Sequence, residues 1–128
     1  MSYSNIENKF NSGDIVILDG GMGAELENLG ASMDKDLWSG RCSIDEPDFV
    51  HKAHQNFVNS GADIITTNTY ASTPISMREY GYENHIEEWN NASVNIAKSV
   101  ANNSDREIAI AGSVSTYGSW DKIEPKYL

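Results

Sequence analysis

The chain has 128 residues, with 19 acidic and 9 basic side chains and a formal net charge of −10. This length bounds it to about one domain, and the acidic balance excludes binding modes that neutralise phosphates, so we expect no nucleic acid and no anionic membrane as a partner. The single cysteine excludes a disulfide framework. No apolar run reaches the roughly 18 residues of a membrane span, and the polar start is not a secretory signal, so we expect a cytoplasmic α/β protein.

Three short apolar segments predict the strands of a parallel sheet, over residues 14–19, 62–67 and 107–112. Four consecutive apolar residues in the first segment indicate a strand that is buried on both faces. Helices are predicted over 24–29, from Glu46-Pro47 to Ser60-Gly61, and over about 83–103. Residues 1–13 are expected to be a lead-in or a short helix. The alternation of strand and helix predicts an α/β fold built from βα units.

The end of the chain is unusual because no helix is predicted after the third strand. Such a sheet would have an open edge and half-covered faces, and three strands cannot close a barrel. We therefore expect the chain to be the front part of a longer protein. In isolation, it is expected to aggregate, to oligomerise or to stay partly unfolded.

Polar loops follow all three predicted strands: Asp19–Gly23, Thr66–Tyr70 and Gly112–Gly118. Because ligands bind at the carboxyl ends of parallel strands, these loops predict a small-molecule site. The Asp19 carboxylate would pair with an ammonium group, and the backbone N–H groups after Gly20 could hold a carboxylate. The alternative interpretation is structural, with Asp19 capping the turn and the glycines permitting a tight bend.

Other common sites are not indicated. Gly21-Met22-Gly23 does not complete a dinucleotide fingerprint because Leu26 stands where the third glycine would lie, and no Gly-Lys-Ser/Thr of a phosphate-binding loop occurs. His51 and His54 lie three residues apart, but His54 falls on an apolar helix stripe, which favours a satisfied core histidine over a metal ligand.

Four segments, taken in order, resemble the homocysteine S-methyltransferase family. They are Ile17–Glu27, Leu37-Trp38-Ser39, His54 leading to Ser60–Tyr70, and Ile110–Val114 with Tyr117-Gly118. The resemblance implies that residues 14–128 are the first three βα units of a homocysteine-binding (β/α)8 TIM barrel, truncated after strand 3. It also implies transfer of a methyl group to the sulfur of homocysteine, giving methionine.

The resemblance assigns roles to six residues of this chain. It puts Asp19 and Gly20 at the amino-acid head group of homocysteine, with Thr66 and Asn68 as further polar contacts. Trp38 and Tyr70 would form an aromatic wall on the side of the methyl donor, where a sulfonium or ammonium group gains from cation–π contact. For these two aromatic residues, ordinary packing at the barrel mouth is the alternative.

The resemblance also implies zinc, held by three cysteine thiolates from later strands and binding the homocysteine thiolate. This chain has only Cys42, so no metal ligand and no catalytic residue is expected within it, and alone it should not catalyse methyl transfer. A non-catalytic truncated paralogue, binding an amino acid or a protein partner, is the main alternative. A different barrel enzyme, such as a lyase, is a third. The methyl donor (S-methylmethionine, S-adenosylmethionine, betaine or a folate or cobalamin carrier) and the oligomeric state are left open.

Overall fold

The computed structural model describes residues 3–115. Its strands are β1 (Ile64–Thr66) and β2 (Ala109–Ala111). Its helices are α1 (Ser4–Ser12), α2 (Met22–Leu29), α3 (Cys42–Asp45), α4 (Pro47–Asn59), α5 (Pro74–Glu79) and α6 (Ile86–Asn102), with the 3-10 helices η1 (Ser39–Arg41) and η2 (Glu83–His85). The predicted motif residues Tyr117 and Gly118, and the rest of the domain predicted to reach residue 128, lie outside the described residues. No helix of the described part is both long and apolar enough to cross a membrane.

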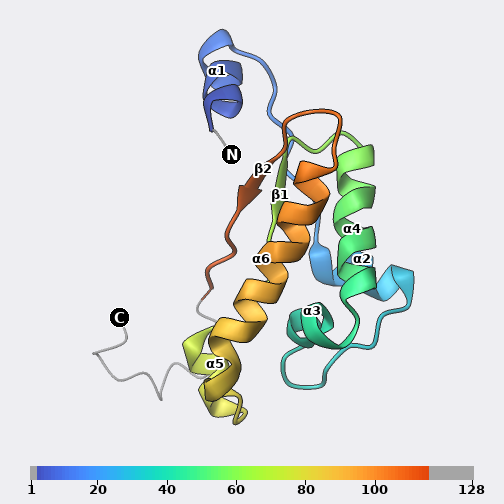
Figure 1. Ribbon diagram of the computed structural model, residues 1–128, viewed down its shortest axis with the longest axis vertical. Helices are drawn as coiled ribbons and strands as arrows, with labels where there is room; N and C mark the ends of the chain where they lie inside the picture. Colours follow the sequence, from blue (N-terminus) through green and yellow to red (C-terminus); the bar gives the residue numbers. More distant parts are fainter. Residues whose placement is uncertain (1–2, 116–128) are drawn as a thin grey trace.

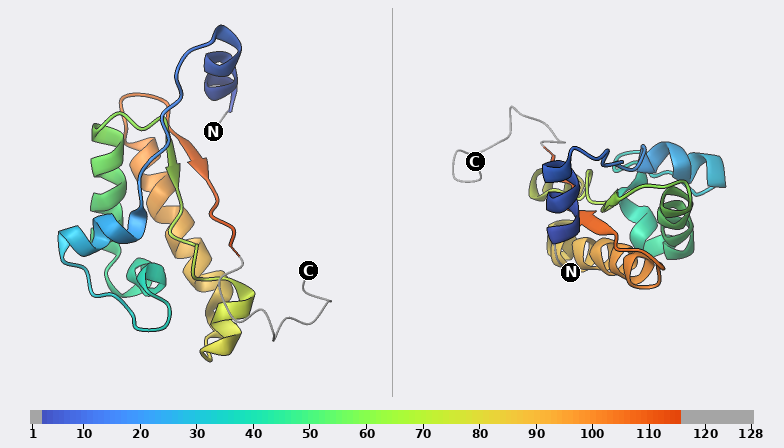
Figure 2. Two further views of the ribbon diagram at one scale, coloured as in Figure 1. Left: turned by 180° about the vertical axis from the view of Figure 1, so that it is seen from behind. Right: turned by 90° about the horizontal axis from the view of Figure 1, so that it is seen from above.

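The two strands run parallel, with Ile64 opposite Ala109 and Thr66 opposite Ala111. Helices α4 and α6 pack together over one face of this pair (Figures 1 and 2). Between them lies an apolar cluster made of Val58, Ile65, Ala97, Val100, Ala101 and Ile108. The predicted mixed α/β architecture is therefore confirmed, and burial of this face holds the strands to α4 and α6. Two further buried clusters, one around Leu26 and Val50 and one around Leu37, Met77 and Trp89, join the other helices to these two.

The first predicted strand is wrong in both extent and burial. Segment 14–19 pairs with β1 through a single bridge, between Leu18 and Ile64. The Asp63 carboxylate accepts the Ile17 N–H at 3.0 Å, so a side chain takes the donor that a longer ladder would use. The side chain of Ile15 is 82% exposed and that of Leu18 is 59% exposed, so the segment is not buried on both faces as predicted.

Local signals explain the helices that were predicted. The predicted helix 24–29 is α2, and Gly30 ends it in the left-handed conformation at φ 89°. Pro47 occupies the first turn of α4. The helix predicted over about 83–103 is η2 followed by α6. Two short helices were not predicted, α3 and α5; the second begins at Pro74, after Thr73 accepts the Ser76 N–H.

An ion-pair cluster closes the end of the sheet at which the strands begin. Lys9, from the predicted lead-in that forms α1, lies 2.7 Å from the Asp63 carboxylate, and Arg106 lies 3.4 Å from the same oxygen. Arg106 also donates to the carbonyls of Val58 and Ala62. Burial by itself would raise the pKa of Asp63, but the hydrogen bonds from Lys9 and Ile17 hold it below its usual value. The lead-in is thus tied to the sheet.

His54 on α4 is fully buried, as its place on the apolar stripe predicted. The prediction that it is satisfied is wrong, because within residues 3–115 neither ring nitrogen has a hydrogen-bond partner. Burial, with a smaller contribution from His51, lowers the pKa of His54 to about 4. At neutral pH the core therefore holds the uncharged imidazole.

Candidate functional site

A cavity of about 310 Å³ opens at the carboxyl end of the strands. Its lining includes all six predicted site residues: Asp19, Gly20, Trp38, Thr66, Asn68 and Tyr70. Asp19 and Thr66 are the last residues of segment 14–19 and of β1, and the other four lie in the loops after segment 14–19, β1 and α2. The structure thus brings the predicted residues to one place, although their roles toward a ligand stay predictions.

Among the described residues, Thr66 supplies both hydrogen bonds to the Asp19 carboxylate. The backbone N–H of Thr66 donates to one Asp19 carboxylate oxygen at 2.6 Å, and the Thr66 hydroxyl donates to the other at 2.8 Å. Within residues 3–115, no lysine, arginine or histidine forms an ion pair with Asp19. Each oxygen of an ionised carboxylate has capacity for a second donor. Asp19 is therefore a fixed acceptor that faces the cavity with capacity to spare.

Asn68 lines the same cavity but bonds differently. Its side-chain N–H groups donate to the Ser39 carbonyl at 2.8 Å and to the Ser43 hydroxyl at 3.2 Å, and its side-chain oxygen accepts from the Ser39 hydroxyl at 3.1 Å. The hydroxyls of Ser43 and Ser93 share a hydrogen bond of 2.7 Å, and Ser93 donates to the Asn68 carbonyl. This buried Asn68–serine network links the loop after β1 to α3, η1 and α6.

Trp38 stands at the mouth of the cavity in an unusual backbone conformation. Its φ is 51° and its ψ is −116°, and among the described non-glycine residues it alone has a positive φ. A conformation of this kind costs on the order of 1–3 kcal/mol and persists only where the surroundings fix it. The side chain is 42% exposed and that of Tyr70 is 49% exposed, so both rings offer surface to a ligand.

Gly23 gives the Trp38 indole its place. A Cβ atom at position 23 would lie between 2.5 and 3.0 Å from three atoms of the indole. The ring therefore rests directly against the first turn of α2, where no side chain fits between them. The sequence reading missed this role, because it explained the glycines of this loop by the tight bend alone.

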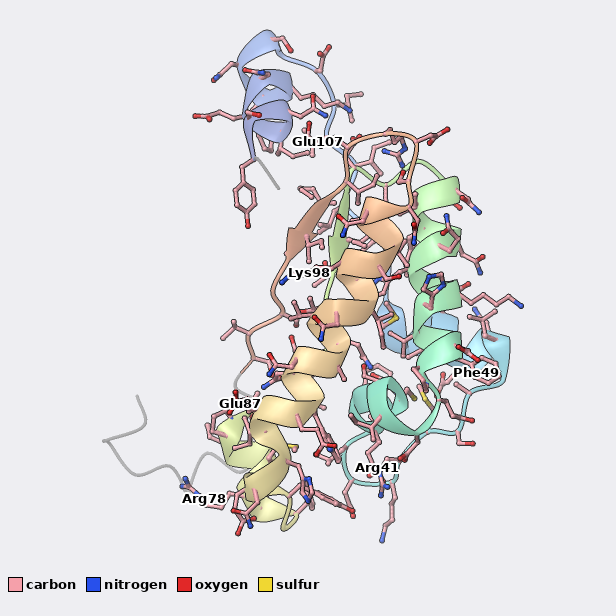
Figure 3. The ribbon with its side chains drawn as sticks, viewed as in Figure 1. Arg41, Phe49, Arg78, Glu87, Lys98 and Glu107 are labelled. Carbon is pink, nitrogen blue, oxygen red and sulfur yellow. The ribbon has the colours of Figure 1, made fainter. Side chains whose placement is uncertain are left out.

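The loop that carries Trp38 is clamped at several points. The Trp38 carbonyl accepts the Asp34 N–H at 2.8 Å. Arg41, labelled beside α3 in Figure 3, places its guanidinium 5.5 Å from the Tyr82 ring centre and 5.9 Å from that of Trp89, and it pairs with Asp45 at 3.0 Å. These contacts attach the loop to Tyr82, which directly precedes η2, and to α6.

The loop after β2 is tied to the loop after β1 in the same way. The Ser113 N–H donates to the Thr67 hydroxyl at 3.1 Å, and the Thr69 hydroxyl donates to the Ser113 carbonyl at 2.7 Å. Ser113 also lines the cavity. Hydrogen bonds between neighbouring loops therefore fix the shape of this cavity wall.

The described residues do not fit a zinc site. Within residues 3–115, no group of three or more His, Cys, Asp or Glu side chains could hold a metal ion. Cys42 is 1% exposed, and its thiol donates to the Ser32 carbonyl at 3.5 Å. Burial, followed by the charge of Glu46, raises the pKa of Cys42 to about 11, so this thiol stays protonated at neutral pH.

Comparisons with known proteins decide the family. The family model described as homocysteine S-methyltransferase matches residues 16–127. The chain belongs to the homocysteine S-methyltransferase family. This confirms the resemblance drawn from the four sequence segments.

Related proteins of the homocysteine S-methyltransferase family cover most of this chain. Homocysteine S-methyltransferase 2 of Arabidopsis thaliana is 29% identical over 88% of the chain and 41% of its own length. Selenocysteine Se-methyltransferase of Brassica oleracea var. italica is 36% identical over 62% of the chain and 23% of its own length. The homocysteine methyltransferase MmuM of Escherichia coli, in its metallated form, superposes with a TM-score of 0.71 at 30% identity, over 81% of this chain and 38% of the enzyme. The chain thus spans less than half the length of each of these relatives.

Proposed function

We propose that the protein carrying this chain transfers a methyl group to the sulfur of homocysteine, giving methionine. In this proposal, the described residues form the part of the pocket that binds the amino-acid head group. The observation that carries the proposal is the Asp19 carboxylate, fixed by two Thr66 hydrogen bonds and facing a cavity, in a chain of this family.

The head group of homocysteine is an ammonium beside a carboxylate. Asp19 would accept hydrogen bonds from the ammonium, because each of its oxygens has capacity beyond the one bond from Thr66. Gly20 and the backbone N–H groups at the start of α2 would face the carboxylate, where the positive end of the helix dipole favours a negative charge. This arrangement orients the substrate while leaving its thiol free to point elsewhere.

The donor side of the pocket would be formed by Trp38 and Tyr70. Both rings are about half exposed at the cavity. A methyl donor that carries a sulfonium or ammonium charge gains from contact with the face of such rings. Whichever of the donor classes named above is used, its methyl group would have to reach the homocysteine sulfur between these walls.

Zinc and the remainder of a TIM barrel complete the proposal. Bound zinc would supply a thiolate from the substrate thiol at neutral pH, and its ligands would come from outside the described residues. The chain's own part is to bind and orient. The structural likeness to the Escherichia coli enzyme supports the barrel, and the cytoplasmic location stays a prediction.

Isothermal titration of the intact protein with L-homocysteine tests the head-group assignment. Asp19→Asn should weaken binding by at least about 2 kcal/mol, or roughly 30-fold, because the ammonium loses its charged partner. The same variant should bind 4-mercaptobutanoate, which lacks the amino group, as the unmodified protein does. Asp14→Asn is the matched control, since Asp14 is exposed and bonded to Ser12 outside the cavity. Unchanged homocysteine affinity in Asp19→Asn would contradict the proposal.

A further inference from the structure

We infer that Asn68 is a positioning residue: it holds the Trp38 turn in its unusual conformation and so fixes the indole wall of the cavity, instead of contacting the ligand itself. For the ligand, this inference rests on the proposed function. For the position of the indole, it stands on the structure alone.

The first support is that the Asn68 side chain has little capacity left for a ligand. Asn68 is 3% exposed. Both of its amide N–H groups are used, one on the Ser39 carbonyl and one on the Ser43 hydroxyl, and its oxygen already accepts from the Ser39 hydroxyl. A side-chain amide offers two donors and one acceptor oxygen. A substrate acceptor could therefore reach Asn68 only by breaking one of its N–H bonds, and a substrate donor could use only the second lone pair of its buried oxygen.

The second support is where those bonds act. Two of the three end on Ser39, the residue that directly follows Trp38. Before Trp38, the Leu37 N–H donates to an Asp34 side-chain oxygen at 2.8 Å, and the Asp34 N–H in turn donates to the Trp38 carbonyl. The unusual φ and ψ of Trp38 therefore lie between two fixed residues, Leu37 held by Asp34 and Ser39 held by Asn68.

The third support is the anchoring of the Asn68 end. Ser43 receives an Asn68 N–H and shares a hydrogen bond with Ser93 on α6, and Ser93 donates to the Asn68 carbonyl. All three of these residues are buried. Because α6 belongs to the packed core, the network transmits the rigidity of that core to the Trp38 turn.

The physical consequence follows from strain. A strained residue keeps its conformation only while its surroundings over-determine it. Without the Asn68 donors, the Ser39 end of the turn is released and Trp38 can relax to ordinary backbone angles. The indole would then lose its contact with Gly23, and the cavity would lose one wall.

Fluorescence of Trp38 in the intact protein tests this inference without any ligand. The contribution of Trp38 is obtained by subtracting the signal of each protein's Trp38→Phe counterpart, which leaves Trp89 and Trp120 in place. Asn68→Asp removes both donors while keeping the volume of the side chain. We expect acrylamide quenching of Trp38 to increase by about two-fold, as the indole moves from 42% exposure toward full exposure, with a red shift of its emission.

A matched control separates positioning from general loosening. Thr73→Ala removes another buried hydrogen-bonding side chain, at the start of α5 and outside the Trp38 cavity, and should leave the Trp38 signal unchanged. If Asn68→Asp does not fold, Ser43→Ala provides the same test with a smaller loss. Unchanged Trp38 quenching in whichever of these two variants folds would overturn the inference.

A double-mutant cycle then separates this inference from the proposed function. If Asn68 acts through Trp38, Asn68→Asp should weaken homocysteine binding by about ten-fold in the unmodified protein and leave it nearly unchanged in a Trp38→Ala background. Equal losses in both backgrounds would mean direct contact and would overturn the inference. If homocysteine does not bind the unmodified protein, the proposed function fails, and the quenching experiment alone decides the role of Asn68.

Discussion

Each end of the sheet holds an aspartate, and the two carboxylates differ in their bonding partners. At the end where the strands begin, Asp63 is saturated by Lys9, Arg106 and the Ile17 N–H. At the end where they finish, Asp19 receives hydrogen bonds from its neighbour Thr66 and no cation within residues 3–115. An aspartate therefore stabilises the fold at one end of the sheet and has free capacity for a ligand at the other. The bonding partners of each carboxylate, and not the residue type, determine this difference.

His54 extends this comparison to a polar group that has no partner at all, and it carries the largest expected effect. Its pKa is about 4 in the folded chain against 6.5 for a free histidine. Between these two values the unfolded chain binds a proton that the folded chain does not, so stability falls as the pH is lowered from 6.5 to 4. The loss attributable to His54 is about 3 kcal/mol, measured by urea unfolding of the intact protein across this range.

His54→Leu isolates that contribution, because it fills a similar space with nothing to protonate. Its free energy of unfolding should depend less on pH between 6.5 and 4 than that of the unmodified protein. Acid sensitivity should persist in both proteins below pH 3.8, because the pKa of Asp63 is lowered from that value in the folded chain and its contribution to stability is lost as the carboxylate is protonated. Identical pH dependence in the two proteins would show that His54 is not buried in its neutral form.

Asp63→Asn tests the saturated end. It should lower the free energy of unfolding by about 2 kcal/mol, less than for a fully buried ion pair, because Lys9 and Arg106 are partly in water. Homocysteine affinity of the folded fraction should not change, which is the reverse of the result expected for Asp19→Asn. Urea unfolding and calorimetric titration of both variants measure the contrast. Loss of affinity without loss of stability in Asp63→Asn would break the comparison between the two ends.

Gly23→Ala tests the open end by the smallest change. The added Cβ would fall within 3.0 Å of the indole, so Trp38 must move and ligand affinity should drop by about ten-fold, while the better helix propensity of alanine offsets part of the cost in stability. Gly112→Ala is the control, since Gly112 does not line this cavity and its added Cβ would meet no atom within 4 Å. The two affinities should differ clearly when titrated side by side.

Local chemistry made much of the fold predictable. Gly30 and Pro47 mark helix ends by rules that act within a few residues, and the apolar stripe of α6 has the helical period. The extent of segment 14–19 was not predictable in this way. Its apolar run looks like a strand, but the Asp63 carboxylate, distant in sequence, takes the Ile17 N–H. Such competition between a side chain and the ladder leaves no periodic signal.

The candidate site, like the fold, has features that the sequence predicts and features that depend on contacts between distant segments. Parallel strands finish at one edge, so the sequence could predict that Asp19, Thr66 and Asn68 meet at a cavity. It could not predict that Thr66 holds Asp19 or that Asn68 bonds to Ser39 and Ser43, because those bonds depend on three-dimensional contacts between separate loops. The role of Gly23 is of the same kind, since only the folded chain brings the Trp38 indole against it.

The Asp63 cluster also has a consequence for how the molecule opens. Asp63 bonds to Lys9, which lies 54 positions before it in sequence, and to Arg106, which lies 43 positions after it. One carboxylate therefore binds both α1, near the beginning of the described chain, and the segment just before β2. Neither segment can fray without disturbing the fastening of the other. Amide protons in α1 and β2 should therefore exchange with solvent through a shared opening event, at similar rates, and Asp63→Asn should uncouple them.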